Sequence, residues 1–292
     1  MKKLTAVFLL IIMLTTNVCS ESISESTSQQ RTPQQQSSQQ QSSIELPIIM
    51  YHFLTENKGE HHISPEEFER DLVFLEQNGY NTISVSELIA FVHEGGDLPP
   101  NPVMLTFDDG YYNNYVYAFS LLQKHDAKGL ISVIGDHTDI WSVNFYEDLD
   151  AGHFTWNHIM EMKNSGFVEF GNHTYSMHRF KHGHKGATRK HGENLLDYQR
   201  LFGRDVNRLQ TRFLEECGFA PDIFAFPYHS VCDEAIQVLK ILGFRAALTG
   251  AANGKTNTIT RGDPDCLFDL RRTNRSRLRP VEAILAPIEA DD

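Results

Sequence analysis

The stretch NPVMLTFDDG, residues 101–110, has the pattern of a buried strand that ends at two carboxylates. Asp108 and Asp109 are followed by Gly110, and then by the helical pattern of residues 111–125. Adjacent carboxylates at a strand end can divide two roles, one binding a metal while the other stays free as a base. The structural alternative is an acidic turn in which an aspartate caps the next helix.

The same order of an apolar run followed by a helical pattern recurs along the chain. The strand candidates are residues 46–52, 80–85, 101–108, 127–135, 167–174, 222–228 and 244–250. The helical pattern at 64–79 begins with a capping-box signature, with Ser64 as N-cap, Pro65 at the first helical position and Glu67 three residues on. Such alternation predicts parallel strands with crossover helices, in a barrel or in a doubly wound open sheet.

Polar side chains gather at the ends of the predicted strands, which favours the barrel. Tyr51 and His52, the aspartate pair, His173 and Tyr228 all follow apolar runs, where parallel α/β folds place their active sites. We therefore predict a distorted (β/α)7 barrel in one domain, residues 44–280.

Two histidines in GNHTYSMH, residues 171–178, are candidates for metal ligands. Residues five apart point about 140° away from each other on a helix and to opposite faces of a strand. His173 and His178 can therefore converge only where a strand runs into a loop. With Asp109 they form the three-ligand set typical of a catalytic zinc site, although His182 or His184 could replace His178, and a solvated histidine-rich loop is the structural alternative.

The two ends of the chain are predicted to lie outside this domain. Residues 1–20 resemble a secretory signal peptide, residues 21–43 form a Ser/Gln-rich tether, and residues 281–292 form a tail. We expect a secreted or extracytoplasmic protein that is associated with the cell surface. Loose association with the membrane or the cell wall is compatible with this expectation, and lipidation at Cys19 is the less favoured alternative.

The net charge bears on the class of partner, and the cysteine count bears on disulfide bonds. The net charge of -12 disfavours nucleic acid, and the arginine-rich stretch at 271–279 is interpreted as a solvated tail segment. Three cysteines remain after the signal segment, an odd number that fits no disulfide framework: Cys217, Cys232 and Cys266. Oligomeric state is left open.

Three motifs together resemble the polysaccharide deacetylases of the NodB-homology type, carbohydrate esterase family 4. TFDDG resembles the first family motif, which implies that Asp108 is the catalytic base and Asp109 a metal ligand. GNHTYSMH resembles the second, which implies that His173 and His178 bind the same metal. FAFPYHS, residues 224–230, resembles the third, which implies that the Tyr228 N–H meets the oxyanion and that its ring walls the substrate groove.

Departures from the commonest motifs point to one branch of the family. The four-residue gap between the histidines resembles that of poly-N-acetylglucosamine deacetylases of biofilm systems. Ala225 stands where the third motif usually has an arginine that orients the base, and Arg271 or Arg272 is a candidate replacement. The same branch carries its acid near the N-terminus in a strand ending Tyr-His, which implies His52 as the acid.

The resemblance implies metal-dependent hydrolysis of N-acetyl groups on an amino-sugar polymer: poly-N-acetylglucosamine, a chitin-like polymer or the glycan of peptidoglycan. The metal is expected to be zinc, with cobalt or nickel also compatible with the ligands. Tyr111 is a further candidate for substrate contact. Two other classes remain open, a carbohydrate O-acetyl esterase such as an acetyl-xylan esterase, and a carbohydrate-binding domain whose site has decayed.

Overall fold

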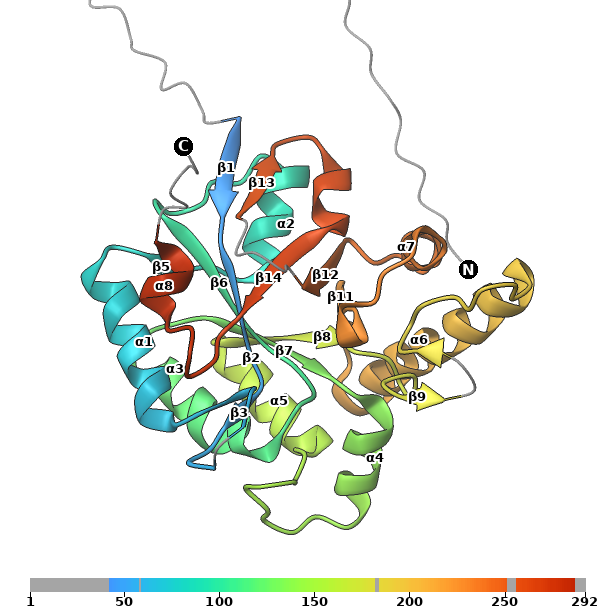
Figure 1. The fold of residues 1–292 in the computed structure, drawn as a ribbon, viewed down its shortest axis with the longest axis horizontal. Helices are drawn as coiled ribbons and strands as arrows, with labels where there is room; N and C mark the ends of the chain where they lie inside the picture. Colours follow the sequence, from blue (N-terminus) through green and yellow to red (C-terminus); the bar gives the residue numbers. More distant parts are fainter. Residues whose placement is uncertain (1–41, 58, 182–183, 251–255, 287–292) are drawn as a thin grey trace, which may run out of the picture. The chain divides into compact units, whose positions relative to one another are not determined.

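A closed ring of parallel strands forms the centre of the domain (Figure 1). The computed structural model describes residues 42–57, 59–181, 184–250 and 256–286. Around the ring the order is β2, β14, β12, β11, β8, β7 and β6, and pairing of β6 with β2 closes it. The bounds of these strands are β2 Ile48–Tyr51, β6 Pro102–Phe107, β7 Gly129–Val133, β8 Val168–Asn172, β11 Ile223–Ala225, β12 Ala246–Gly250 and β14 Leu270–Asn274. The predicted distorted (β/α)7 barrel is confirmed.

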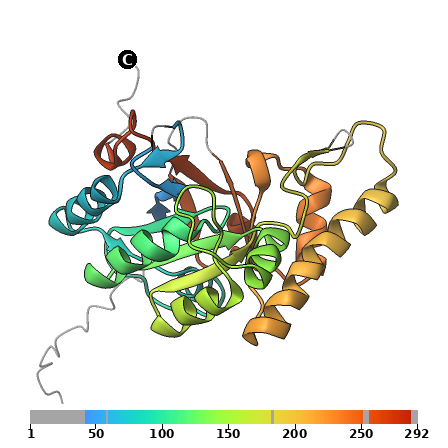
Figure 2. The ribbon, with the colours of Figure 1, turned by 90° about the horizontal axis from the view of Figure 1, so that it is seen from below.

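Helices connect the strands on the outside of the ring. They are α1 Pro65–Gln77, α2 Val85–His93, the π-helical η1 Asn114–Phe119, α3 Ser120–Lys124, α4 Gly135–Val143, α5 Trp156–Ser165, α6 Leu195–Cys217, α7 Asp233–Ile241 and α8 Val281–Leu285. The predicted start of α1 is confirmed, because Ser64 and Glu67 form the reciprocal bonds of a capping box. Figure 2 shows the long α6 beside α7, against which it packs.

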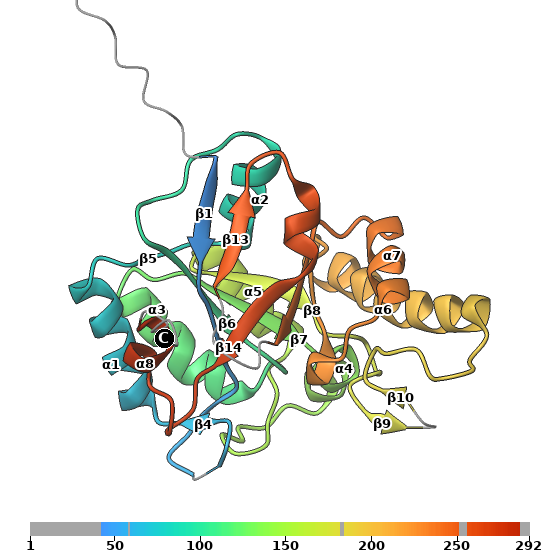
Figure 3. The same cartoon turned by 45° about the horizontal axis from the view of Figure 1, so that its top comes forward.

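Short strand pairs and 3-10 turns lie outside the ring. Among them β1 Ser43–Leu46 pairs antiparallel with β13 Asn257–Thr260, as Figure 3 shows. Two further pairs are β3 Phe53–Leu54 with β4 His62–Ile63, and β9 Phe180–Lys181 with β10 His184–Lys185. Short 3-10 turns, η2 Pro227–His229 and η3 Pro264–Phe268, follow β11 and β13.

The seventh strand of the ring is not the one that the sequence pattern suggested. The predicted strand at 80–85 is the two-residue β5 Asn81–Thr82, which pairs with β6 outside the ring. Its place in the ring is taken by β14, which overlaps the arginine-rich stretch 271–279 that the sequence analysis interpreted as a solvated tail segment. That interpretation is wrong for Arg272 and Arg275, whose side chains are 0% and 4% exposed and are paired with buried carboxylates.

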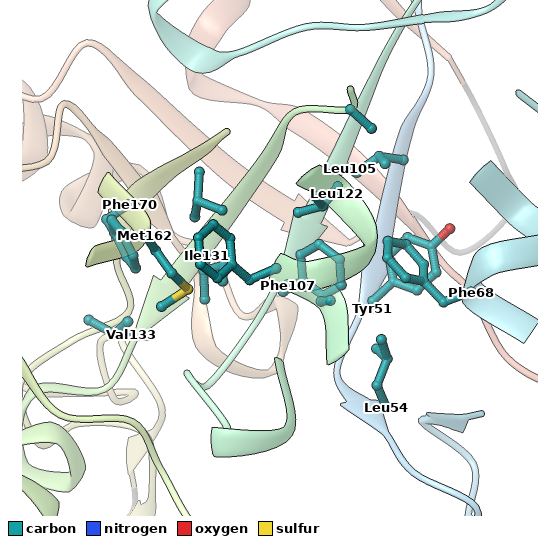
Figure 4. Packing of buried hydrophobic residues seen from close by; sticks show 14 of the residues in the cluster. Tyr51, Leu54, Phe68, Leu105, Phe107, Leu122, Ile131, Val133, Met162 and Phe170 are labelled. Carbon is teal, nitrogen blue, oxygen red and sulfur yellow. The ribbon is translucent and has the colours of Figure 1, made fainter. Parts of the chain in front are cut away.

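Successive residues of a ring strand face different hydrophobic clusters, as their alternation requires. Ile48 packs in a cluster with Met104, Leu130 and residues of α2, whereas its neighbour Ile49 packs in the cluster under α1, α3 and α5. Figure 4 shows part of the second cluster, in which Phe107 lies between neighbouring strands and the helices outside them. A third cluster lies between β11, β12 and helices α6 and α7.

The ends of the described chain are packed. α8 contacts α1, and its Val281 and Ile284 are buried, so the packed residues continue beyond 280. The predicted signal peptide with Cys19, most of the tether and residues 287–292 of the predicted tail lie outside the described residues. All three cysteines of the domain are free thiols. No helix within the described residues combines the length and the apolar character that a membrane span needs.

Candidate functional site

Polar residues that follow four strands meet at one rim of the ring. His52 follows β2, Asp108 and Asp109 follow β6, His173 follows β8, and Tyr228 follows β11. Because the strands of the ring are parallel, their carboxyl ends lie on the same side of the barrel. The electrostatic coupling of His52, Asp108, Asp109 and His173 reflects this convergence.

A left-handed turn sends the two aspartates in different directions. Asp109 has φ 72° and Gly110 has φ 73°, so the chain bends sharply where β6 ends. A Cβ at Gly110 would lie 3.1 Å from side-chain atoms of both Phe154 and Val133, which leaves little room for any larger residue. The ring of His153 donates a hydrogen bond from Nδ1 to the Asp109 carbonyl, at 3.0 Å, and holds the turn.

Asp109, His173 and His178 form a group that could hold a metal ion. Their ligand atoms all lie within 4.8 Å of one another. Nε2 of His173 and Nε2 of His178 lie 3.5 and 3.4 Å from Asp109 Oδ1, which is buried and has no hydrogen-bond partner. Two ligands of a tetrahedral ion with bonds of about 2.0–2.1 Å lie about 3.4 Å apart. The three residues therefore fit a divalent ion of this kind.

Hydrogen bonding sets which nitrogen of His173 faces the group. His173 Nδ1 lies 2.7 Å from the Ala225 carbonyl oxygen, which can only accept, so Nδ1 donates this bond and Nε2 is the ring nitrogen that faces Asp109. For His178, burial and then the charge of His173 lower the pKa to about 4, which leaves this ring neutral near pH 7. Burial alone would raise the pKa of Asp109, but the two histidines lower it well below its ordinary value.

The two alternative ligands, His182 and His184, are not part of this group as the structure describes it. His184 lies elsewhere, with Nε2 3.2 Å from Glu193 Oε1 and Nδ1 bonded to the Thr188 carbonyl. His182 lies outside the described residues. Within the part of the chain that the structure describes, His178 is the second histidine that reaches Asp109.

Asp108 turns away from this group and pairs with Arg272. Nη1 and Nη2 of Arg272 donate to Oδ1 and Oδ2 of Asp108 at 2.7 and 2.8 Å. Burial alone would raise the pKa of Asp108, but Arg272 and the nearby histidines lower it to about 2. Of the two arginines considered as replacements for the missing motif arginine, the structure brings Arg272 to Asp108, whereas Arg271 pairs with Asp269 at the surface.

Tyr228 lies on a strained turn after β11. Its φ is 55° and that of His229 is 56°, left-handed values that side chains other than glycine rarely adopt. The turn places the Tyr228 ring 4.5 Å from the ring of His178. The Tyr228 ring therefore lies beside one of the three possible metal ligands.

His52 and Tyr111 lie near the aspartates. Burial lowers the pKa of His52, against the opposing effects of Asp108 and Asp109, and its Nδ1 is buried without a hydrogen-bond partner. Tyr111 stacks on Phe53 with ring centroids 3.6 Å apart, and burial followed by the charge of Asp109 raises the pKa of its hydroxyl.

One histidine near the site escaped the sequence analysis. Burial and then the charge of Arg272 lower the pKa of His229 to about 4, and this ring also interacts with Asp108 and His52. Its ring packs so closely on Gly250 that a Cβ there would lie 2.2 Å from His229 Nδ1. Since Gly250 belongs to a different strand, no local signal in the sequence indicates this contact.

Comparison with known proteins gives a consistent family. A model of the polysaccharide deacetylase family matches residues 95–247. The poly-beta-1,6-N-acetyl-D-glucosamine N-deacetylase of Escherichia coli K12 is 28% identical over 202 residues, covering 62% of this chain and 30% of the relative. The enzyme of the same name from Staphylococcus epidermidis is 24% identical over 187 residues, 64% of this chain and 61% of the relative. This chain thus spans less than a third of the length of the Escherichia coli protein that it matches.

Solved structures share the fold. IcaB from Ammonifex degensii aligns with a TM-score of 0.67 and 25% identity, over 83% of this chain and 97% of that chain. A de-N-acetylase from Aggregatibacter actinomycetemcomitans aligns with a TM-score of 0.68 and 22% identity, over 80% and 95% of the two chains. Since the family match spans more than half of the 292 residues and contains Asp109, His173 and His178, this chain belongs to the polysaccharide deacetylase family.

Proposed function

We propose that this protein is a metal-dependent polysaccharide N-deacetylase that hydrolyses acetamide groups of an amino-sugar polymer and releases acetate. One arrangement carries the proposal: the ionised carboxylate of Asp108, held by Arg272, directly precedes Asp109, which faces His173 and His178. Amide hydrolysis needs a base for water and an electrophile for the carbonyl, and the two adjacent aspartates supply the sites for both.

The metal group is assigned to Asp109, His173 and His178. A divalent ion bound there would supply Lewis-acid chemistry toward the acetyl carbonyl and its nucleophile. Zinc is the first choice because two imidazoles and a carboxylate suit it, and cobalt or nickel suits the same ligands. The hydrogen bond from His173 Nδ1 to Ala225 keeps that ring in the orientation required of a ligand.

Asp108 is assigned as the base. Each carboxylate oxygen accepts one bond from Arg272, and a second lone pair remains on each oxygen for the proton of an attacking water. Arg272 also prevents the carboxylate from rotating, because both of its N–H donors lie in one plane. We assign Arg272 as the positioning residue of the base, in the role of the arginine that Ala225 replaces.

Tyr228 and His52 are assigned to the later steps. The backbone N–H of Tyr228 is the donor for the oxyanion of the tetrahedral intermediate. His52, when protonated, gives a proton to the leaving amine, and burial, which lowers the pKa of His52, makes that imidazolium a stronger acid. Tyr111 is assigned to the wall of the same site because its ring lies beside Phe53 and His153.

The substrate is assigned from the relatives. Both the Escherichia coli and the Staphylococcus epidermidis relatives are named as deacetylases of poly-beta-1,6-N-acetyl-D-glucosamine, which makes that polymer the first choice. A chain with net charge -12 suits a polymer that gains amines as it loses acetyl groups. Such a polymer lies outside the cell, in agreement with the signal peptide expected at residues 1–20. The pairing of Arg272 with Asp108 supplies a guanidinium in place of the missing motif arginine, which supports an active site over a decayed one.

Acetate release across several polymers tests the activity. The metal-loaded protein is expected to release acetate from poly-beta-1,6-linked N-acetylglucosamine faster than from chitin oligomers, peptidoglycan or acetyl-xylan, and a chelator should abolish the release. Release from acetyl-xylan alone would make the protein an O-acetyl esterase. Bound metal without release from any polymer would favour a binding domain.

Histidine substitutions test the ligand set. His178→Ala should weaken metal binding by more than about 100-fold, because it removes one of three ligands. His184→Ala is the matched control and should keep metal affinity within about twofold, since that ring pairs with Glu193. Metal titration and elemental analysis measure both. If His178→Ala kept its full metal content and His182→Ala lost it, His182 would replace His178 in the ligand set.

Arginine substitutions test the positioning of the base. Arg272→Lys should lower kcat about 100-fold with metal content unchanged, because an ammonium cannot hold both oxygens of Asp108. Arg271→Lys is the control, since Arg271 is half exposed and pairs with Asp269. Kinetics, elemental analysis and Tm are measured on each variant. An Arg272→Lys protein with normal kcat and normal Tm would contradict the assignment.

Leaving-group dependence tests His52. His52→Ala should slow amide hydrolysis by about 100-fold or more but aryl acetate hydrolysis much less, because an aryloxide departs without a proton. The measurement is kcat/KM on an N-acetyl oligomer and on an aryl acetate, with His62→Ala, a ring that packs on Phe53, as the control. Equal losses on the two substrates would remove His52 from the acid role.

A further inference from the structure

Phe180 is an exposed aromatic residue that directly continues the aromatic wall of the site. Phe180 is 69% exposed, although it lies only two residues after His178. The Phe180 ring lies 4.5 Å from the Tyr228 ring, which itself lies 4.5 Å from the ring of His178. Phe180, Tyr228 and His178 therefore form a continuous row of rings that runs from the solvent to the metal group.

The backbone on both sides of Phe180 is fixed. Phe180 pairs with Lys185 across β9 and β10, and the Gly186 N–H donates to the Arg179 carbonyl at 3.2 Å. The Arg179 guanidinium donates to Asp136 at the start of α4. The backbone of Phe180 thus lies between a neighbouring side chain bonded to a helix and a short backbone ladder.

The same ribbon rests on the turn that carries Tyr228. Gly186 has φ 56°, and a Cβ there would lie 2.9 Å from the Pro227 Cβ and 3.2 Å from the Tyr228 ring. No side chain fits between the two segments, so the β9–β10 ribbon and the η2 turn make direct contact. This contact fixes Phe180 and Tyr228 relative to each other.

A fixed and exposed ring beside a carbohydrate site has a chemical use. The axial C–H groups of a pyranose make one face of the sugar apolar, and that face packs on aromatic rings. An aromatic side chain has only two rotatable angles, so it loses little conformational entropy when it binds. Lys185 pairs with Phe180 in the ladder, so both side chains leave the same face of the ribbon, and Lys185 is exposed. A cationic glucosamine unit would be repelled there, whereas an N-acetylated unit would not.

We propose that Phe180 forms a subsite that binds an uncharged, N-acetylated sugar next to the unit being hydrolysed. This inference rests on the proposed deacetylase function. It makes the enzyme favour long, acetylated stretches of polymer over single sugars, and it makes Phe180 a specificity residue that does not touch the reacting atoms.

Chain-length dependence tests the subsite. For the metal-loaded wild-type protein, kcat/KM should rise from the monomer through the dimer to the pentamer of N-acetylglucosamine. Phe180→Ala should lose about two- to tenfold more kcat/KM on the pentamer than on the monomer, chiefly through KM, and Phe180→Trp should restore most of the loss. Ile241→Ala, at an 81% exposed position on α7 outside the row of rings, is the matched control and should match the wild type.

The expected preference for uncharged, N-acetylated units is tested with a variant of Lys185. A pentamer in which the units flanking one acetylated sugar are deacetylated should be a poorer substrate than the full pentamer, and Lys185→Gln should reduce the difference. Equal losses of Phe180→Ala on monomer and pentamer, or no loss on either, would overturn the subsite while leaving the deacetylase function standing. A wild-type protein that binds metal but releases no acetate from any oligomer would instead contradict the proposed function itself.

Discussion

The ion pair between Arg272 and Asp108 is the interaction on which both the barrel and its site depend. The two side chains are 0% and 4% exposed, so neither charge is solvated by water. Removing an ion from water costs several kcal/mol, and removing one member of a buried pair costs about 3–5 kcal/mol, because the other charge stays uncompensated. Arg272 also donates to the Thr249 carbonyl and to Thr106 Oγ1, so one guanidinium on β14 links strands β12 and β6.

The pair also explains how two adjacent carboxylates come to differ. Both oxygens of Asp108 accept hydrogen bonds from one guanidinium. In contrast, Oδ1 of Asp109 is buried, has no hydrogen-bond partner and faces two imidazole rings. Nothing in the composition of an Asp-Asp dipeptide distinguishes its members. The distinction arises because the left-handed turn at Asp109 rotates the second side chain away from the arginine. Two chemically identical side chains are thereby placed in different surroundings.

Sequence reasoning predicted those parts of the fold that rest on local patterns. The ring strands other than β14, the capping box at Ser64 and the strand-end positions of His52, Asp108 and His173 follow from hydrophobic runs and capping residues. β14 was missed because Leu270–Asn274 contains two arginines, and a buried arginine cannot be told from an exposed one without its partner. Asp108 lies 164 positions from Arg272 in the chain, so that partner becomes visible only when the ring closes. The contact of His229 with Gly250 was hidden for the same reason.

Two buried arginines, Arg272 in β14 and Arg275 just after it, pair with different buried carboxylates. Arg272 fixes Asp108, while Arg275 donates to both oxygens of Asp71 on α1, at 2.7 and 2.9 Å. Asp71 in turn accepts a hydrogen bond from the hydroxyl of Tyr51, the residue that precedes His52.

The backbone of the same segment supports this link. The Arg275 N–H donates to the Met50 carbonyl at 2.8 Å, and β14 pairs with β2 along the ring. The segment that closes the barrel therefore holds Asp108 through one guanidinium. Through the other it holds Asp71, which contacts Tyr51 at the end of β2. Because Arg275 directly follows β14, which is paired with β12 on one side and β2 on the other, a shift of that strand would displace the contacts to Asp108 and to Asp71 together.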